Sequence, residues 1–363
     1  MADFYEKTFM AKRKGISALQ TNKTINAAEN KGPESTTSFF VVGIGASAGG
    51  LNAIQEIISQ FPADLNAAVF IVLHVSKLGM PEFMIERMKK NTRLDCKIAK
   101  QDDKIVPGTI YFAAPDAHLL VKDDRIVLGY GPAENRFRPS IDVLFRSIAA
   151  SHGGRGVGVV LTGFLNDGTV GSNAIKQSGG YTIVQDPNEA EYPDMPLSVL
   201  ETMEVDHCVS LSKMGETIAH IVRKAEVTST TPPRVVIMES RLSEKAATSI
   251  DEVSRLGEKS LFSCPDCGGP LWNIDKPVLH FRCHIGHSYS EKDLLYKQSE
   301  SIEQTLWVSI RMMEERRILL LRNARTYNEK GLKKLSVQIA DRAMQLGTHI
   351  EKLKDLLFAV NTD

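Results

Sequence analysis

The feature that most constrains this chain is an apolar stretch that ends in a glycine-rich turn and continues into a helical pattern. The stretch runs Phe39-Phe-Val-Val-Gly-Ile-Gly-Ala-Ser47-Ala-Gly-Gly50, and apolar residues recur at helical spacing from Leu51 onward. This pattern predicts a strand, a sharp turn and a helix. Such a corner lifts Ser47 above the carboxyl edge of a sheet, where small neighbours and helix N-terminal amides surround it. A serine in this position can act as a nucleophile whose oxyanion those amides stabilise.

The same turn fits two motifs. Gly45-Ala-Ser47-Ala-Gly49 matches the G-x-S-x-G nucleophile elbow, and Gly43-Ile-Gly-Ala-Ser-Ala48 matches the G-x-G-x-x-A dinucleotide fingerprint. The fingerprint also needs an acidic residue at the end of the second strand to hold a ribose. The second strand reads Ala67-Ala-Val-Phe-Ile-Val-Leu-His74-Val75, and its polar side chain is a histidine. Because a hydrolase needs a base there, we favour hydrolysis, with nucleotide binding as the alternative.

Strand-like and helix-like runs alternate from Phe39 to Val222. The predicted strands are 39–44, 68–75, 95–99, 109–113, 156–162, 181–185 and 207–210, with a hairpin over 118–130. The predicted helices are 51–60, 81–91, 141–151, 170–178, 196–201 and 213–224. The strands show little polar alternation, which is typical of a sheet covered on both faces. We therefore predict an α/β fold with a doubly wound, mostly parallel sheet flanked by helices.

The remaining segments divide by composition. Residues 1–37 predict a flexible leader with a short helix near 4–14, and residues 38–225 form the α/β domain. Residues 226–260 predict a linker with a short helix at 250–256. A small metal module over 261–289 and a helical tail over 290–363 complete the chain.

The tail predicts two helices. Ser290 and Asp293 form a plausible cap, and the first helix should end near Asn328-Glu-Lys-Gly331. In the second, apolar residues recur every three or four positions: Leu332, Leu335, Ile339, Ala343, Leu346, Ile350, Leu353 and Leu357. We expect a helical hairpin that packs on itself or on the module, and a dimerisation surface is the alternative.

Composition narrows the functional classes. The 363 residues include 44 basic and 44 acidic side chains, so no overall field favours nucleic acid or an anionic membrane. No apolar stretch approaches the length that spans a bilayer, and no signal-peptide core begins the chain. The five cysteines are an odd number, and three of them cluster. We expect a cytoplasmic protein without nucleic-acid partners or membrane insertion.

A serine nucleophile needs a base and an acceptor that orients the base. His74 ends the second predicted strand, and Asp167 follows the run Gly158-Val-Val-Leu-Thr162. Because parallel strands place their carboxyl ends at one edge, Ser47, His74 and Asp167 should converge there. His118 and His152 are weaker candidates.

At these residues the domain resembles the CheB family of chemotaxis protein-glutamate methylesterases. The matching blocks are 43–50, 72–74, 107–115, 138–142, 161–163, 166–168 and 185–187, in the family's order. The family's catalytic triad falls on Ser47, His74 and Asp167. The resemblance implies hydrolysis of glutamate γ-methyl esters, and deamidation of glutamines, on a methyl-accepting chemoreceptor or a related methylated signalling protein. A cognate methyltransferase is a further candidate partner.

The resemblance also implies an oxyanion and substrate region around Ala48, Gly49 and the Phe164 loop. Arg138 either engages acidic residues near methylation sites or precedes a helix that Ser140 or Asp142 caps. Three departures affect these expectations. Ala48 stands where many members carry threonine, and Phe164-Leu165 replaces Met-Gly, where a leucine does not easily take a positive φ. We also expect no receiver domain before Phe39. A degenerate esterase that scaffolds signalling partners through its module and helices is therefore the alternative function.

A second constellation is Cys264-Pro-Asp-Cys267-Gly-Gly, followed by Cys283-His-Ile-Gly-His287. A C-x-x-C knuckle with a second arm of cysteine and histidine is typical of a structural Zn²⁺ site with four protein ligands. Cys283 and His287 have the better spacing for that arm, and His284 is the alternate ligand. A redox C-x-x-C is the competing interpretation. Trp272, Phe281 and Tyr289 should form a small core that depends on the metal, and no cofactor is expected for catalysis.

Overall fold

A computed structural model of the chain describes residues 39–74, 82–227, 229–275 and 278–360. Its main sheet has seven strands that all run parallel, in the order β3-β4-β2-β1-β7-β8-β9. These strands are β1 (Phe40–Ala46), β2 (Ala67–Leu73), β3 (Asp95–Ile98), β4 (Thr109–Phe112), β7 (Gly156–Val160), β8 (Tyr181–Gln185) and β9 (His207–Val209). The predicted doubly wound α/β fold is confirmed. The leader and Val75, predicted to end β2, lie outside the described residues.

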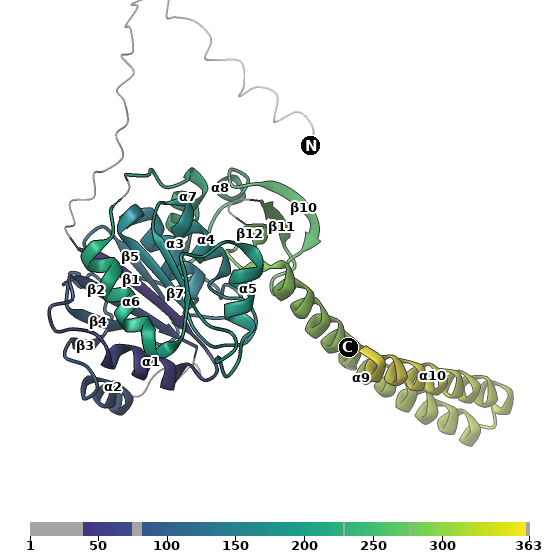
Figure 1. The fold of residues 1–363 in the computed structure, drawn as a ribbon. Coiled ribbons are helices and arrows are strands. Elements are labelled where there is room, and N and C mark those ends of the chain that lie inside the picture. The colour runs from purple at the N-terminus through teal and green to yellow at the C-terminus, as the bar shows by residue number, and fades with distance from the viewer. Residues whose placement is uncertain (1–38, 75–81, 228, 276–277, 361–363) are drawn as a thin grey trace, which may run out of the picture. The chain divides into compact units, whose positions relative to one another are not determined.

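Helices cover both faces of this sheet (Figure 1). They are α1 (Gly50–Ser59), α2 (Glu82–Lys89), α3 (Ile141–His152), α4 (Thr169–Gln177), α5 (Asp194–Thr202) and α6 (Leu211–Lys224). The hairpin of β5 (His118–Lys122) and β6 (Arg125–Gly129) packs with α3. Every residue of β1 and β2 is buried, which explains why their sequences are almost continuously apolar.

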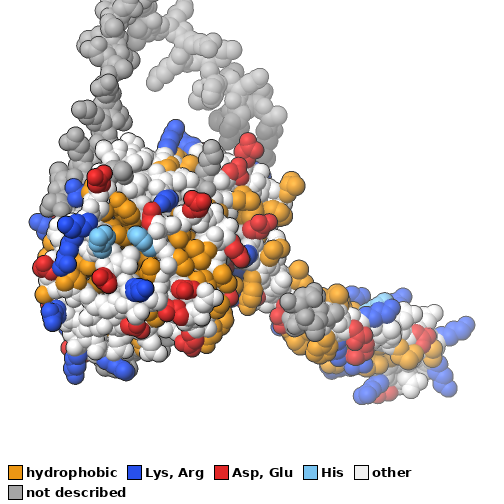
Figure 2. All heavy atoms as spheres, viewed as in Figure 1, with side chains coloured by type: hydrophobic (Ala, Val, Ile, Leu, Met, Phe, Trp, Pro, Cys, Tyr) orange, Lys and Arg blue, Asp and Glu red, His pale blue; other side chains and the backbone are white. Residues whose placement is uncertain are grey.

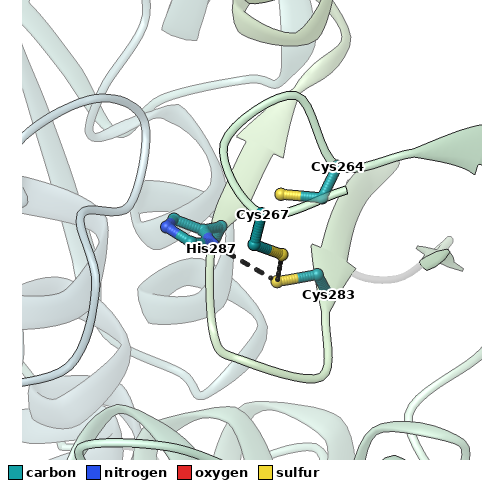
Figure 3. Close-up of side chains that lie close together, drawn as sticks. All are labelled: Cys264, Cys267, Cys283 and His287. Carbon is teal, nitrogen blue, oxygen red and sulfur yellow. Dashed lines mark hydrogen bonds between the residues drawn. The ribbon is translucent and has the colours of Figure 1, made fainter. Parts of the chain in front are cut away.

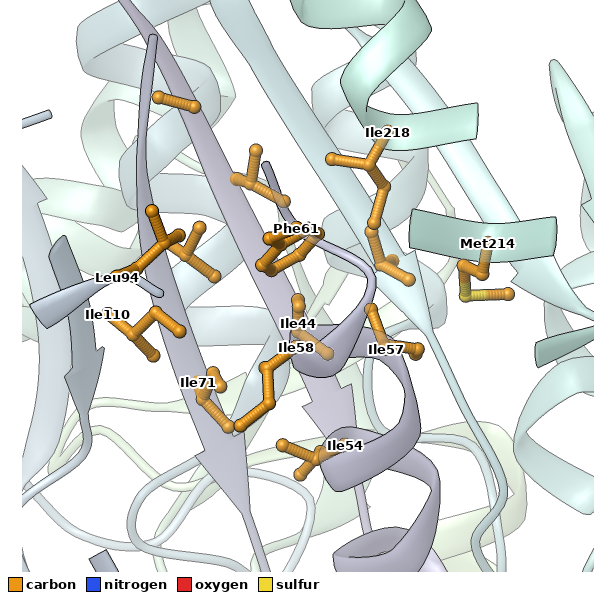
Figure 4. Close-up of a cluster of buried hydrophobic side chains, with 14 of the residues drawn as sticks. Ile44, Ile54, Ile57, Ile58, Phe61, Ile71, Leu94, Ile110, Met214 and Ile218 are labelled. Atoms are coloured by element: carbon orange, nitrogen blue, oxygen red, sulfur yellow. The ribbon is translucent and has the colours of Figure 1, made fainter. Parts of the chain in front are cut away.

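The two faces of the sheet have separate cores. On one face, Ile44 and Ile71 from the strands pack with Ile54, Ile57 and Ile58 of α1 (Figure 4). The spacing of the α1 residues places them on one side of the helix, as its sequence pattern predicts. The other core is formed with α3, α4 and α5.

β1 lies between β2 and β7, so the chain winds in one direction from β1 to β2 and in the other towards β7, β8 and β9. In open α/β sheets, the crevice outside the carboxyl ends of strands at such a switch point is the usual place for a ligand. Ser47 follows β1, His74 follows β2, and Asp167 lies after β7. The topology therefore brings the three predicted residues to the same edge.

The segment 226–260 differs from the predicted linker. It contains the unpredicted helix α7 (Arg234–Ser243), which packs against α3, whereas the short α8 (Ile250–Val253) lies within the short helix predicted at 250–256. Val236 and Leu242 are buried. The prediction failed because the flanking Thr and Pro residues dominated the composition, while α7 gains its stability from tertiary packing.

The C-terminal part contains an antiparallel sheet and two long helices. The sheet has the order β10 (Glu258–Ser263), β11 (Pro270–Ile274), β12 (His280–Cys283) and β13 (Ser288–Ser290). The helices are α9 (Glu291–Glu329) and α10 (Lys333–Val360). The Ser290 side chain accepts a hydrogen bond from the Asp293 amide, so the predicted cap is confirmed.

The predicted helical hairpin is also confirmed, because Ile310 of α9 packs with Ile350 and Leu357 of α10. Leu332 and Leu335, at the start of the predicted apolar stripe, are exposed. None of the helices in the described ranges combines the length and hydropathy needed to cross a bilayer. Basic and acidic side chains are interspersed on the face shown in Figure 2, in line with their equal numbers.

Candidate active site

Ser47 lies at the turn between β1 and α1. Its amide donates a hydrogen bond to the Thr162 carbonyl (3.0 Å), and its carbonyl accepts one from the Gly50 amide (2.9 Å). Gly49 has a φ of 73°, a left-handed conformation that glycine adopts without steric strain. Across the turn, a Cβ added to Gly163 would lie 2.6 Å from the Ser47 Cβ, so glycine permits this close approach. These contacts fix the serine backbone at the carboxyl edge of the sheet.

His74 lies at the end of the neighbouring strand. Its amide donates to the Ala46 carbonyl (3.0 Å), next to Ser47 in the chain. Its Nε2 is 3.0 Å from Asp167 Oδ2, and its side chain is 3% exposed. The imidazole stacks on the Phe137 ring, with centroids 3.5 Å apart. Because the carboxylate accepts a hydrogen bond from Nε2–H, the proton of the neutral ring lies on Nε2. Nδ1 therefore keeps its lone pair and can act as a base. Among the described residues, this buried Nδ1 has no hydrogen-bond partner.

Asp167 is buried and accepts several hydrogen bonds. Oδ2 accepts from His74 and from the Ile141 amide (2.7 Å), which lies at the N-terminus of α3. Oδ1 accepts from Asn135 Nδ2 (3.0 Å), Ser140 Oγ (3.0 Å) and the amides of Asp142 and Gly168 (both 3.1 Å). Burial opposes ionisation, but the hydrogen bonds from His74, Asn135 and Ile141 outweigh it and lower the pKa of Asp167. The carboxylate is therefore held ionised beside the imidazole.

The structure thus joins His74 and Asp167 directly and places Ser47 on the adjacent strand end. Within the described ranges, no hydrogen bond links Ser47 to His74. Such bonds are often long in a free enzyme and tighten when substrate binds.

The surrounding loop contains the unusual pair of residues after Gly163. The Phe164 side chain is 51% exposed and contacts Tyr192, with ring centroids 4.4 Å apart. Leu165 has a φ of 68°, so it adopts the conformation expected to be difficult for it. A left-handed non-glycine residue costs about 1–2 kcal/mol. The Ala48 carbonyl accepts a hydrogen bond from the Thr162 hydroxyl (3.1 Å). The role of the Ala48 and Gly49 amides as oxyanion donors stays a prediction.

The 138–142 block differs from the predicted helix cap. Ser140 precedes α3 but makes no side-chain cap, because the amides of Ile141 and Asp142 donate to the Asp167 carboxylate, to which the Ser140 hydroxyl also donates. The Asp142 carboxylate accepts from the Gly171 amide (2.6 Å) and from Asn135 Nδ2 (2.6 Å). Arg138 donates to Asp116 Oδ1 through Nε (3.0 Å) and Nη2 (2.6 Å), so an intramolecular carboxylate already holds it. Its role towards substrate stays a prediction.

The two weaker histidine candidates lie outside this cluster. His118 is buried between the Pro132 carbonyl (2.9 Å) and the Ser140 amide (3.2 Å). His152 is buried at the end of α3, where burial and then the charge of Arg155 lower its pKa to about 4. Both environments are typical of neutral histidines within a core.

Sequence reasoning missed two residues that contact the predicted triad, Asn135 and Phe137. They lie in an irregular loop before α3, where no periodicity or motif marks them. Asn135 Nδ2 donates to the carboxylates of both Asp142 and Asp167, and Phe137 stacks on His74. The preceding residue, Glu134, is buried although it is charged.

The second predicted site gathers Cys264, Cys267, Cys283 and His287, whose side chains point toward one another (Figure 3). Their potential ligand atoms all lie within 4.8 Å of one another. Cys267 Sγ is 3.8 Å from Cys283 Sγ, which is 3.4 Å from His287 Nδ1. Tetrahedral zinc with Zn–S bonds of about 2.3 Å requires sulfur atoms about 3.8 Å apart. The donor set fits a tetrahedral metal ion, and His287 is the histidine whose ring nitrogen lies within this group of potential ligand atoms.

The small core of this module differs from the predicted one. Phe281 and Tyr289 pack together with Leu271. Trp272 instead packs with Leu242 of α7. Successive β11 residues point to opposite faces of the sheet, so Leu271 and Trp272 belong to different clusters.

Fold and site together define an α/β protein with the residues of a serine hydrolase at its switch point. The CheB methylesterase family model matches residues 42–218. A protein from Leptospira interrogans is 36% identical over 180 residues, which are 49% of this chain and 93% of that protein. The chain belongs to the CheB methylesterase family.

Longer relatives match over the same domain. Proteins from Methanosarcina mazei and Photorhabdus laumondii, both named protein-glutamate methylesterase/protein-glutamine glutaminase, are 35% and 34% identical. The matches cover 52% and 48% of this chain and 54% and 51% of those proteins. The crystal structure of the Thermotoga maritima CheB methylesterase catalytic domain is 27% identical, with a TM-score of 0.48 over 51% of this chain and 100% of that chain.

Proposed function

We propose that this protein is a protein-glutamate methylesterase that hydrolyses glutamate γ-methyl esters on a methyl-accepting chemoreceptor or a related signalling protein. The observation that carries this proposal is the buried His74–Asp167 pair beside the Ser47 turn, with His74 Nδ1 unpartnered among the described residues. Family membership supports the substrate class. Deamidation of glutamine side chains belongs to the same proposal, since the relatives' names include it.

In the proposed reaction, Ser47 Oγ attacks the ester carbonyl while His74 Nδ1 accepts the hydroxyl proton. Asp167 stabilises the resulting imidazolium, and the amides of Ala48 and Gly49 stabilise the oxyanion. Collapse of the tetrahedral intermediate breaks the bond to the methoxy group, which takes the proton from His74 and leaves as methanol. Water, deprotonated by His74, then attacks the acyl-serine and releases the glutamate side chain, which restores the Ser47 hydroxyl.

The test is methanol release from membranes that carry methylated receptors. Wild type should release methanol, and Ser47→Ala should lower the rate by about 10³-fold or more because the nucleophile is lost. Ser212→Ala near the start of α6 is the matched control, since this exposed serine follows β9, three strands away from β1 in the sheet, and should leave the rate unchanged. Full activity in Ser47→Ala would refute the nucleophile. No release by wild type would favour the scaffold alternative.

We also propose that Cys264, Cys267, Cys283 and His287 hold a structural Zn²⁺ ion. Thiolates and an imidazole are preferred zinc ligands, and four protein ligands leave no open position for catalysis. A metal there would join the β10–β11 turn to β12 and stabilise the module. A cytoplasmic location, a cognate methyltransferase partner and dimerisation through α9 and α10 remain predictions.

A further inference from the structure

One short loop contacts both His74 and Asp167. In this 134–137 loop, Asn135 Nδ2 is 3.0 Å from Asp167 Oδ1, and the Phe137 ring stacks on the imidazole at a centroid distance of 3.5 Å. The Asn135 amide binds the carboxylate oxygen that does not face His74, and the Phe137 ring lies parallel to the imidazole plane within 8°. Both side chains therefore act through another residue, and both are positioning residues.

The backbone of this loop is unfavourable by itself. Asn135 and Arg136 have φ values of 49° and 72°, which non-glycine residues rarely adopt. Within the loop, Glu134 and Phe137 exchange amide-to-carbonyl hydrogen bonds of 3.1 and 3.0 Å. A strained conformation persists where surrounding structure over-determines it.

The surrounding structure comes from the C-terminal sheet. The Asn135 amide donates to the Ser288 carbonyl of β13 (2.9 Å), and Glu134 forms a parallel bridge with the same residue. Arg282 of β12 donates to both Glu134 oxygens, through Nη1 (3.1 Å) and Nη2 (2.8 Å). Nearby, Asn166 Nδ2 donates to Ser290 Oγ (2.5 Å), so the loop that carries Asp167 is held as well.

These anchors are buried. The Arg282 and Glu134 side chains are 1% and 2% exposed. Glu134 also accepts from Arg146 of α3 and Ser243 of α7. A bidentate guanidinium–carboxylate pair in such surroundings defines geometry more sharply than a single surface contact. Removing one partner leaves the other buried and partly uncompensated.

We propose that the β12–β13 segment is a positioning element of the active site, in which Arg282 and Ser288 hold the 134–137 loop so that Asn135 and Phe137 orient Asp167 and His74. The effect on rate rests on the proposed esterase function. The match covers 93% of the Leptospira relative, which therefore has little sequence outside the matching region to form an equivalent of β12–β13.

The test compares Arg282→Gln with wild type in the full-length protein. The kcat for methanol release should fall at least tenfold while KM changes less than threefold, because the reacting groups are misplaced and substrate contacts are not. Backbone amides of residues 134–137 should also exchange hydrogen faster. Lys292→Gln is the matched control. It removes an exposed ion pair between Lys292 of α9 and Glu201 of α5 (3.3 Å), which likewise joins the C-terminal part to the main domain but does not involve the 134–137 loop. It should leave both readouts unchanged.

Two further variants separate positioning from a general loss of folding. Arg282→Lys keeps the charge but has no planar fork, so it should recover part of the lost kcat. Asn135→Ala leaves Arg282 in place and should lower kcat with little change in KM. A folded Arg282→Gln protein with wild-type kcat and wild-type exchange at 134–137 would overturn the proposal, as would an Asn135→Ala variant with full kcat.

The outcomes distinguish this proposal from the proposed function. If wild type releases no methanol, the esterase assignment fails. Faster amide exchange at 134–137 in Arg282→Gln would still support the proposal that β12–β13 holds this loop. If wild type is active and Ser47→Ala is inactive, an Arg282→Gln variant with unchanged rate and unchanged exchange refutes the positioning role of β12–β13 and leaves the esterase assignment intact.

Discussion

At the scale of single residues, the site contains two buried carboxyl groups, Asp142 and Asp167, whose pKa values are shifted in opposite directions. Asn135 donates one hydrogen bond to each, Asp142 and Asp167. Burial and then the negative charge of Asp167 raise the pKa of Asp142 to about 7. Asp167 has more donors, including His74, and its pKa is lowered. The environment therefore keeps the charge on the carboxylate that faces the histidine and favours a proton on the one behind it.

Replacing Asp142 should change how stability depends on pH. Well below pH 4 the carboxyl is protonated in both the folded and unfolded chain, so its titration contributes nothing there. As the pH rises to about 7, ionisation favours the unfolded chain and the wild type loses stability, while Asp142→Asn stays neutral. The free energy of unfolding of the variant should therefore gain about 2–3 kcal/mol on wild type between pH 5 and pH 7. Urea titrations at both pH values measure this, and a constant difference between the two proteins would contradict it.

The site residues that follow predicted strands could be predicted from the sequence. Ser47, His74 and Asp167 follow strands that the apolar runs mark, and parallel strands end at one edge. Asn135 and Phe137 could not be found in this way, because an irregular loop has no periodicity and its conformation depends on Ser288, far along the chain. A cap by Ser140 or Asp142 was one of two interpretations of the 138–142 block, because such residues before helices usually cap them, but here the Asp167 carboxylate accepts hydrogen bonds from the amides of Ile141 and Asp142.

At the scale of elements, the sequence pattern identified the strands of the main sheet and the helices α1 to α6, most of which contribute buried apolar residues to the two cores. It missed α7, which is as long as α1 but follows a stretch of Thr and Pro residues in the sequence. It also identified the α10 stripe, although burial begins only at Ala343. The N-terminal part of that stripe, Leu332 and Leu335, is exposed. Helical spacing of apolar residues therefore does not by itself show that another element covers them.

The hairpin core should be sensitive to a single truncation. Ile350 is 1% exposed and packs with Ile310 and Leu357. Ile350→Ala should destabilise the hairpin by about 2–4 kcal/mol, because it removes buried methyl groups and leaves a cavity. Amide exchange in α10 should accelerate while β1 and β2 keep their protection. Met344→Ala, on the same helix but 65% exposed, should have almost no effect. Equal exchange in both variants would show that this cluster does not stabilise the hairpin.

At the scale of the whole molecule, the metal module has little apolar material of its own. Leu271, Phe281 and Tyr289 form one small cluster around the cysteines, while Trp272 packs on the other side against α7 and α8. A core of this size usually needs a metal or a covalent crosslink. Because β12 and β13 also anchor the 134–137 loop, we expect loss of the metal to change the positions of His74 and Asp167.

Removing the metal should therefore be visible in the environment of Trp272. The chain has two tryptophans, of which Trp272 is buried and Trp307 is half exposed, so a Trp307→Phe background isolates the first. Zinc analysis should give one ion per chain. Its removal by a chelator, or Cys283→Ser, should shift the Trp272 emission to longer wavelength and lower the melting temperature. Cys208→Ser, which changes an exposed cysteine outside the cluster, should retain both the metal and the emission. Unchanged emission after complete metal removal would show that the module folds without the ion, and the metal would then have no role in supporting the active site.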